Sequence, residues 1–416
     1  MSYLSQRPWL IDGRTGEAAT YADLLARLNA EDAEFFPLCR PASTREALTQ
    51  IALAVAFDAD LTLFDPDCEV GEIEALGYSP AQLNRPAPRR LGSAPVTLDD
   101  LRRRAAGGSR ARLGLFTSGS TGLPKLVWQS VANLTRAVKV SPRHAEAVWA
   151  LAYRATHVAG IQVFLQALAN GCPLVEVWGL ERAEIFAALE RHGVTHLSAT
   201  PSFYRLLLPA ERALPGVRSV TLGGESADAR LLEKLAAMFP AARRHNVYAS
   251  TEAGTLLVAE GEVFAIAPGL EGRVEVRDGT LHVHRSLLGE FSGAASQGEW
   301  YDTGDTIEAV SAAPLRFRIV ARERDWINVG GSKVNPREVE AVLEEHPAVA
   351  RSRVFGRKNS VLGQVLCAEV VARGAAPMEA DLREFAAAQL QPFKVPRMIR
   401  FVDQIAATRT GKLSRT

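Results

Sequence analysis

The feature that most constrains this chain is an alternation of short apolar segments with helix-like segments, which begins near residue 112. Apolar runs occupy residues 113–116, 173–177, 194–199 and 217–222, and helix-like stretches occupy residues 160–170, 181–192 and 226–239. Short apolar strands that alternate with helices are typical of βαβ units, whose strands lie parallel in one sheet. We therefore predict an α/β chain with a mostly parallel sheet.

The flanking segments follow other patterns. Residues 43–57 predict a helix, because Ser43 and Glu46 have the spacing of a capping box before an apolar run. Residues 79–112 predict an irregular connection with one short helix. Residues 274–284 predict a hairpin, since their central Asp-Gly pair favours a turn with positive φ. We also expect a Gly/Ser-rich loop at 289–300 and a strand at 315–320.

A last helix is predicted to begin after Asn335. Asn335 would be its N-cap, Pro336 its first residue and Glu338 the partner that completes the cap. Its apolar stripe would consist of Val339, Val342 and Leu343, with Pro347 as the stop. We place a domain boundary just before this helix, so that residues 1–321 form a large N-terminal domain, 322–326 a hinge, and 327–416 a small C-terminal domain.

Charge and cysteine content exclude several classes of protein. The 416 residues include 48 basic and 47 acidic side chains, and the resulting net charge of +1 does not favour nucleic acid as a partner. Four cysteines without CxxC spacing argue against a zinc site or a disulfide framework and favour a reducing cytosol. The N-terminus lacks the apolar segment of a signal peptide, and the most apolar stretch, 147–178, is interrupted by Arg154 and His157. We expect a cytoplasmic protein without a membrane span.

The strongest local motif is LFTSGSTGLPK at residues 115–125. A buried strand leads into a loop of glycines and hydroxyls that ends in a lysine. Glycines let the backbone approach an oxyanion, and hydroxyls, amide N–H groups and a lysine can bind it. Such a loop is usually only a loop, but the ordered combination favours a polyphosphate site. Its spacing differs from that of the Walker P-loop.

Four further motifs are weaker when each is taken alone. NVYASTE at 246–252 offers a hydroxyl beside Glu252, which could hold magnesium or could be an ordinary solvated carboxylate. WYDTGD at 300–305 offers a carboxylate on a tight turn, for ribose hydroxyls or for simple Asx bonding. RERDWINVGGSK at 322–333 and TRTGK at 408–412 complete the set, and the latter alone would be a frayed tail.

The residues of these five motifs and their order along the chain resemble those of the adenylate-forming superfamily. This superfamily includes acyl-CoA and aryl-CoA synthetases, stand-alone adenylation domains and firefly-type luciferases. The resemblance runs from about residue 113 to residue 416. It implies an α/β (overall α+β) fold, with a large N-terminal domain of stacked mixed sheets and helices and a small mobile C-terminal α+β domain. The early phosphate loop implies an abbreviated N-terminal subdomain, 1–112, as in the shorter o-succinylbenzoate–CoA ligase-like enzymes.

The resemblance also implies site residues. The phosphate loop would comprise Thr117, Ser118, Gly119, Ser120, Thr121, Gly122 and Lys125, and the adenine pocket Gly223, Gly224, Glu225, Asn246, Val247, Tyr248, Ala249 and Ser250. Thr251 and Glu252 would hold phosphate and magnesium, and Asp305 and Arg322 the ribose. Lys412 would bind the substrate carboxylate and the α-phosphate. Gly330 and Gly331 would border the thiol tunnel, and Arg324 occupies the hinge position, where Asp or Lys is usual.

For the acid, the resemblance places His157 at an aromatic position that gates the carboxylate or the thiol, although a lone histidine in an apolar stretch is more often a satisfied core residue. Other expected pocket residues are His196, Ser198, Thr200 and Phe203. Residues 155–161 contain no Asp that could hold an ammonium group, which favours an acid without an α-amine. The pocket composition suggests a small aryl or hydroxyaryl acid.

The implied reaction is ATP- and Mg²⁺-dependent activation of a carboxylic acid to an acyl-adenylate, followed by transfer to coenzyme A. One alternative is a stand-alone adenylation enzyme that loads a phosphopantetheinyl carrier protein. Another, a nucleotide-binding pseudoenzyme, is disfavoured because Lys125, Glu252, Asp305 and Lys412 are all present. The expected partners are small molecules and, in the alternative, an acyl carrier protein, with the chain a monomer or homodimer.

Overall fold

The structure is a computed structural model that describes residues 3–87, 95–118, 124–225, 227, 229–291, 298–322, 325–329, 332–359 and 363–405. The chain divides into two compact units. The first consists of Met1–Glu275, His282–Asp302 and Ala309–Arg318, and the second of Val276–Leu281, Thr303–Glu308 and Ile319–Thr416. Each unit has buried apolar clusters of its own. The hinge predicted at 322–326 stays a prediction.

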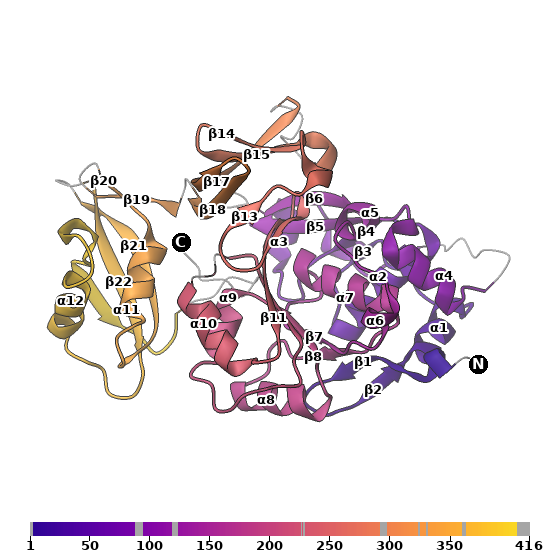
Figure 1. Cartoon of the computed structure of the whole chain (residues 1–416). Helices are drawn as coiled ribbons and strands as arrows, with labels where there is room; N and C mark the ends of the chain where they lie inside the picture. The colour runs from indigo at the N-terminus through magenta and orange to yellow at the C-terminus, as the bar shows by residue number, and fades with distance from the viewer. Residues whose placement is uncertain are drawn as a thin grey trace. The chain divides into compact units, whose positions relative to one another are not determined.

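The predicted parallel sheet is present in the first unit and has eight strands (Figure 1). Their order is β12-β11-β10-β9-β7-β8-β1-β2. The strands are β1 (Pro8–Asp12), β2 (Ala18–Thr20), β7 (Trp149–Leu151), β8 (Leu174–Glu176), β9 (His196–Ala199), β10 (Ser219–Gly223), β11 (Arg243–Ser250) and β12 (Gly254–Ala259). All neighbours pair in parallel except β2 and β12 at the two edges. The antiparallel edges agree with the expected mixed sheets, whereas the N-terminal strand β1 was not predicted.

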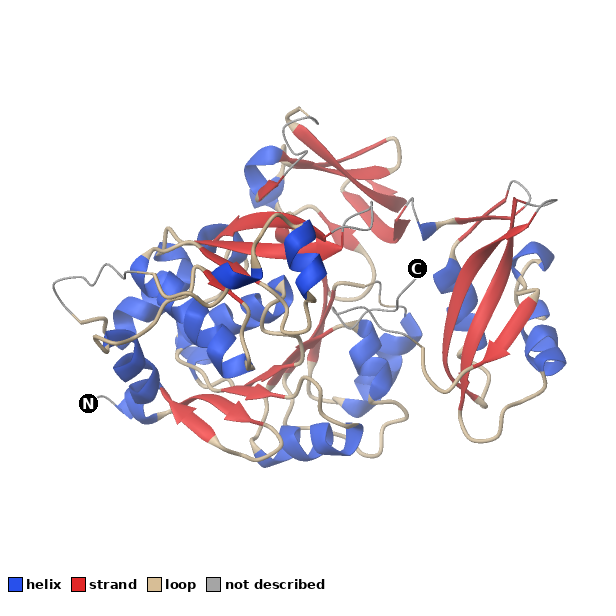
Figure 2. Ribbon diagram, turned by 180° about the vertical axis from the view of Figure 1, so that it is seen from behind, coloured by secondary structure: helices blue, strands red, loops and turns tan. Residues whose placement is uncertain are grey.

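Helices flank these strands (Figure 2). They include α7 (Val158–Asn170), α8 (Arg182–Arg191), α9 (Pro201–Leu206) and α10 (Ala229–Met238). The helix predicted within 226–239 is present as α10, with Leu231, Leu235 and Met238 buried. Helix α7 is buried over most of its length and ends at Gly171, whose φ of 66° suits a left-handed C-cap.

A second sheet of the first unit has the order β16-β6-β5-β4-β3. Its strands are β3 (Leu38–Cys39), β4 (Leu61–Leu63), β5 (Arg112–Ser118), β6 (Pro124–Ser130) and β16 (Glu290–Phe291). Strands β3, β4 and β5 are parallel, whereas β6 returns antiparallel to β5 and pairs with β16. The prediction of a loop throughout 289–300 is therefore wrong at β16, where main-chain pairing with Val127 and Trp128 extends the sheet.

The remaining helices of this unit lie in its N-terminal third and beside β6. They are η1 (Tyr3–Gln6), α1 (Tyr21–Asn29), α2 (Thr44–Phe57), α3 (Val70–Ala75), η2 (Pro80–Gln82), α4 (Leu98–Arg103), η3 (Arg104–Gly108), α5 (Val131–Leu134) and α6 (Pro142–Ala145). Helix α2 is confirmed with Ser43 as N-cap. Its capping box differs from the prediction, because the Glu46 carboxylate accepts the N–H of Ala42 at 2.6 Å.

A third sheet has the order β13-β18-β17-β15-β14. It contains β13 (Phe264–Ala265), β14 (Val274–Arg277), β15 (Thr280–His284), β17 (Trp300–Ala312) and β18 (Leu315–Arg322), with the short helices η4 (Pro268–Leu270) and η5 (Arg285–Leu287) between strands. The Asp278-Gly279 hairpin is confirmed, with φ of 48° and 77°. The tight turn predicted around Asp305 is wrong, because this residue lies within the long strand β17.

The C-terminal part of the second unit has a sheet in the order β20-β19-β22-β21, with β23 beside β22. It comprises β19 (Ile327–Val329), β20 (Ser332–Val334), α11 (Pro336–Leu343), β21 (Val349–Asn359), β22 (Gly363–Ala372), α12 (Glu379–Ala387), η8 (Pro392–Lys394) and β23 (Met398–Phe401). Helix α11 begins as predicted, with the Asn335 side chain accepting the Arg337 N–H at 3.1 Å.

Three details of that prediction are wrong. Helix α11 ends at Leu343, before Pro347, and it is not the last helix, since α12 follows. The Glu338 carboxylate binds Lys394 Nζ at 2.7 Å, so a salt bridge takes the place of the predicted cap. Only Leu382 and Ala386 are buried on α12, a stripe too sparse to stand out in the sequence.

Within the part of the chain that the structure describes, no helix combines the length and the apolar character needed to cross a membrane. Cys39, Cys68, Cys172 and Cys367 are all buried, and none of them forms a disulfide bond. Burial raises the pKa of the Cys39 thiol to about 12 and that of Cys172 to about 11, so neither thiol is an effective nucleophile at neutral pH.

Candidate active site

The carboxyl ends of β9, β10 and β11 bring several predicted site residues to one edge of the eight-stranded sheet. Ser198 pairs with Thr221, and Gly223 pairs with Val247, so these strand ends are level with one another. Thr200 follows β9 directly and N-caps α9, with its Oγ1 accepting the N–H of Phe203 at 3.1 Å. Ligands of open α/β sheets bind beyond the carboxyl ends of the strands, which makes this edge the candidate site.

Tyr153, which we did not predict, also belongs to this edge. It lies two residues beyond β7, and its side chain hydrogen-bonds to Ser198. A Cβ atom added to Gly223 would lie 3.8 Å from the Tyr153 hydroxyl. Burial raises the pKa of Tyr153, so the phenol stays a neutral donor.

Glu225 fastens the Gly223-Gly224-Glu225 segment to α9. Its carboxylate accepts the backbone N–H of Ser202 at 3.0 Å and the Ser202 hydroxyl at 2.8 Å. Gly224 has a φ of 82°, which a residue with a side chain rarely adopts. The segment predicted for the adenine pocket is therefore held in place by its own acidic residue.

Residues 251–253 form the three-residue connection between β11 and β12, and every carbonyl of this connection is hydrogen-bonded. The Gln129 side-chain amide donates to the carbonyls of Thr251 and Glu252, at 2.7 Å each. The N–H of Gly289 also donates to Glu252 O at 2.7 Å, and Arg136 Nη1 donates to Ala253 O at 3.2 Å. Neither Gln129 nor Arg136 was predicted, although together they fix the turn that presents Thr251 and Glu252.

Lys125 is the described end of the phosphate loop. It pairs in register with Thr117 across β5 and β6, and its Nζ lies 3.3 Å from the ring centroid of Phe291. Partial burial lowers the pKa of Lys125, and the negative charge of Glu252 opposes that shift. The lysine and the carboxylate are thus within electrostatic reach of each other. Gly119, Ser120, Thr121 and Gly122, and the side chain of Ser118, lie outside the described residues.

His157 precedes α7 and contacts a carboxylate that we did not predict. Its Nε2 lies 3.0 Å from Asp65 Oδ2, and the neighbouring Thr156 hydroxyl donates to Asp65 Oδ1 at 2.6 Å. Burial alone would raise the pKa of Asp65, but the hydrogen bonds from His157 and Thr156 outweigh it and lower the pKa. A signal for Asp65 was present, since the apolar run 61–64 ends at this carboxylate.

His196 is not brought together with the other predicted pocket residues. It is the first residue of β9, level with Trp149 and Ser219, the first residues of its neighbours, and so lies at the amino edge of the sheet. Its ring packs against that of Trp149, with centroids 4.7 Å apart and planes tilted by 36°. Burial, together with nearby His144, lowers the pKa of His196 to about 4.

In the second unit, Asp305 and Arg322 form a pair. Asp305 is buried, and its Oδ1 accepts from Arg322 Nε at 2.9 Å. The Asp305 N–H donates to Thr303 Oγ1 at 3.1 Å. Two residues predicted for the ribose therefore lie side by side, one as a carboxylate acceptor and the other as a guanidinium donor. Arg324, Gly330, Gly331 and Lys412 lie outside the described residues.

Family models match this chain in two places. The model described as AMP-binding enzyme matches residues 85–275, and the model of the AMP-binding enzyme C-terminal domain matches residues 338–412, which together are well over half of the chain. The chain belongs to the AMP-binding enzyme family. The resemblance inferred from the five motifs is confirmed.

Relatives of this AMP-binding enzyme agree with the ligase class. It is 28% identical over 333 residues to a 2-succinylbenzoate–CoA ligase from Geobacillus kaustophilus, covering 72% of this chain and 67% of that one. It is 27% identical over 346 residues to 4-hydroxybutyrate–CoA ligase 1 from Metallosphaera sedula, covering 73% and 61%. Among solved structures, o-succinylbenzoate CoA synthetase from Bacillus subtilis, in complex with an acyl-adenylate intermediate, is similar with a TM-score of 0.72 at 19% identity, covering 98% and 94%. The predicted fold is confirmed.

The described residues also suit a magnesium ion that binds together with the phosphates of a nucleotide. They contain no group of three or more His, Cys, Asp or Glu side chains arranged to hold a metal by themselves. Magnesium in nucleotide sites is typically bound by one or two carboxylates together with substrate phosphates and water. A single carboxylate, Glu252, on a fully hydrogen-bonded turn near Lys125 suits that mode of binding.

Proposed function

We propose that this AMP-binding enzyme is an ATP-dependent acid–CoA ligase, which converts a carboxylic acid to an acyl-adenylate and then to a thioester. The proposal rests on one observation above the rest. The turn that presents Glu252 is fixed by Gln129, Gly289 and Arg136, within electrostatic reach of Lys125 at the end of the phosphate loop. A cation and a carboxylate held this way suit a Mg²⁺–polyphosphate ligand.

In the first half-reaction, a carboxylate oxygen attacks the α-phosphorus of ATP and the bond to the leaving pyrophosphate breaks. Lys125 would stabilise the charge that grows on the phosphates, and partial burial strengthens that interaction. Magnesium, held by Glu252 with Thr251 beside it, would supply further neutralisation of the polyphosphate. We assign Asp305 and Arg322 to the ribose hydroxyls and Lys412 to the substrate carboxylate and the α-phosphate.

The acid is proposed to be a small aryl or hydroxyaryl acid without an α-amine. Phe203 and Tyr153 place aromatic rings near the carboxyl edge, and Ser198 and Thr200 place hydroxyls there; all four residues are buried. Both relatives named above have substrates without an α-amine in their names. Their names also give CoA as the thiol, which favours CoA over a carrier protein.

The decisive experiment is ATP-dependent thioester formation from a panel of acids, with CoA and, in parallel, with a holo carrier protein. The panel comprises benzoate, hydroxybenzoates, cinnamates, 2-succinylbenzoate, 4-hydroxybutyrate and medium-chain acids. We expect pyrophosphate exchange with at least one aryl acid and thioester formation with CoA. Protein that binds ATP but exchanges pyrophosphate with no acid would instead be a pseudoenzyme, and thioester formation with the carrier alone would identify a carrier-loading enzyme.

A half-reaction test addresses Lys412. Lys412→Ala should abolish most adenylation, because the substrate carboxylate and the α-phosphate lose their shared cation. Thioester formation from a supplied acyl-adenylate should largely persist. Equal loss of both half-reactions would contradict the assignment of Lys412 to adenylation alone.

A further inference from the structure

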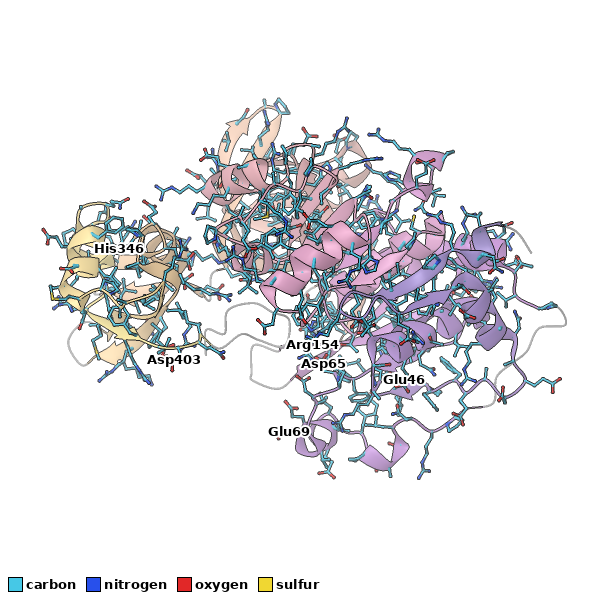
Figure 3. All side chains as sticks on the ribbon, turned by 90° about the horizontal axis from the view of Figure 1, so that it is seen from below. Glu46, Asp65, Glu69, Arg154, His346 and Asp403 are labelled. Atoms are coloured by element: carbon cyan, nitrogen blue, oxygen red, sulfur yellow. The ribbon has the colours of Figure 1, made fainter. Side chains whose placement is uncertain are left out.

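A network of charged side chains links the loop after β4 to the loop between β7 and α7 (Figure 3). Asp65 accepts from Thr156 and contacts His157, while Arg154 forms two hydrogen bonds to Asp67, at 3.0 and 2.9 Å. Arg154 Nη1 also lies 3.9 Å from Asp65 Oδ1. The two loops come from different sheets, so this network joins the carboxyl end of β4 to that of β7.

The network lies beside the start of the phosphate loop. Strand β4 is parallel to β5, with Leu63 paired to Leu115, and the rings of Phe64 and Phe116 lie 4.8 Å apart. One residue further along each strand, Asp65 is therefore level with Thr117. The Asp65–His157 pair thus sits within the candidate active site of the first unit.

The loop that carries His157 leaves little room for rearrangement. A Cβ added to Gly160 would lie 2.2 Å from the carbonyl oxygen of Arg154, a distance that no real side chain tolerates. The His157 N–H donates to the same carbonyl at 3.1 Å, and His157 O accepts the first hydrogen bond of α7 from Ile161 at 2.9 Å. The backbone of His157 is therefore fixed, and only the rotation of the imidazole and its tautomer can change.

The Asp65 contact determines the tautomer. An ionised carboxylate can only accept hydrogen bonds, so His157 Nε2 must carry the hydrogen that lies between them. A neutral imidazole then has its lone pair on Nδ1. Among the described residues, no hydrogen bond to Nδ1 of His157 is formed, and the side chain does not cap α7.

We propose that Asp65 is a positioning residue that holds His157 in the Nε2–H tautomer, so that Nδ1 can accept the thiol proton during thioester formation. This inference rests on the proposed ligase function. The S–H proton moves to Nδ1, the sulfur forms a bond to the acyl carbon, and the acyl–oxygen bond to AMP breaks, with its electron pair leaving on AMP. No other reactant is needed.

Asp65→Asn is the sharpest variant, because it keeps the shape of the side chain while its amide can donate to Nε2 and favour the opposite tautomer. We expect thioester formation from a supplied acyl-adenylate to fall about 10²-fold, and pyrophosphate exchange to stay within about threefold. Asp67→Asn is the matched control, since Asp67 binds Arg154 in the same network; it should leave both rates within about threefold. Asp65→Asn in a His157→Gln background should add little further loss.

Nitrogen NMR of the wild-type protein, labelled at histidine and assigned with His157→Gln, tests the tautomer without altering Asp65. We expect His157 Nδ1 to be unprotonated and Nε2 protonated. A protonated Nδ1 on a neutral ring would overturn the proposal, as would equal loss of both half-reactions in Asp65→Asn or an unchanged thioester rate. Failure of every acid to support pyrophosphate exchange in the wild type would refute the ligase function, while the NMR result would still report on the pair.

Discussion

Two histidines at opposite edges of the eight-stranded sheet have different surroundings. His157 follows β7 at the carboxyl edge and contacts the carboxylate of Asp65 at 3.0 Å. His196 begins β9 at the amino edge and packs against Trp149, with His144 6.2 Å away. One ring contacts a carboxylate, whereas the other is desolvated beside a second histidine, which lowers its pKa.

The difference extends beyond these two residues. At the carboxyl edge, Glu225 and the turn at 251–253 are held by hydrogen bonds to side chains and backbone. At the amino edge, the Trp149 indole N–H and His144 Nδ1 are buried and have no hydrogen-bond partner. Polar groups that are fixed in place suit a site whose ligand must be held in one geometry.

The largest expected effect comes from Glu252→Gln at the carboxyl edge. We assign the Glu252 carboxylate to Mg²⁺ binding, and a neutral amide cannot provide its negative charge. Adenylation should therefore fall about 10²–10³-fold, as measured by pyrophosphate exchange. Glu260→Gln is the matched control, because Glu260 lies at the other end of the same β11–β12 hairpin and is exposed. A similar loss in both variants would mean that the two edges do not differ in function.

A smaller loss is expected from Gln129→Leu, which removes the donor shared by the carbonyls of Thr251 and Glu252. Loss of such a support typically lowers activity about tenfold to 100-fold. Loss of the hydrogen bond to the part-buried Thr251 carbonyl should also lower the free energy of unfolding by about 1–3 kcal/mol, measured by urea denaturation.

Gln166→Leu serves as the control for this variant. Its amide bonds the backbone of Lys139, away from the turn, so stability should fall with little change in the rate. If Gln129→Leu lost stability but kept full adenylation activity, the turn would not need Gln129 for its catalytic geometry.

Local patterns predicted the elements that are themselves local. Strands β8, β9 and β10 and helices α7, α8 and α10 were found because apolar periodicity and capping act over a few residues. Strand β1 was missed because its place depends on pairing with β8, more than 160 residues away in the chain. The same reason applies to Asp65, because its contacts are with Thr156 and His157, which lie 91 and 92 residues away in the chain.

The structure places His196 apart from the other predicted pocket residues for a different reason. Residue type and proximity to a predicted strand suggested a pocket, but only the register with Trp149 and Ser219 reveals that the residue starts its strand. Gln129 and Arg136 were missed because their side chains donate hydrogen bonds to main-chain carbonyls of another segment. Every residue has a main-chain carbonyl, so the sequence of that segment does not indicate such contacts.

The smallest effect is expected from His196→Gln, and it concerns the pH dependence of stability. The pKa of His196 in the folded protein is about 4, below the usual value of about 6.5, so between these values the unfolded chain binds the proton more readily. Stability is therefore lost as the pH falls from about 6.5 toward 4. Removing this ring should reduce the fall in Tm between pH 7 and pH 5 by about 2–4 °C.

Some loss of stability at low pH should remain in His196→Gln, because burial also lowers the pKa of His144, His192 and His245. The KM for the acid should change by less than about twofold, since His196 lies at the amino edge. A raised KM with an unchanged pH dependence of Tm would instead return His196 to the substrate pocket, and the separation of the two edges by function would no longer hold.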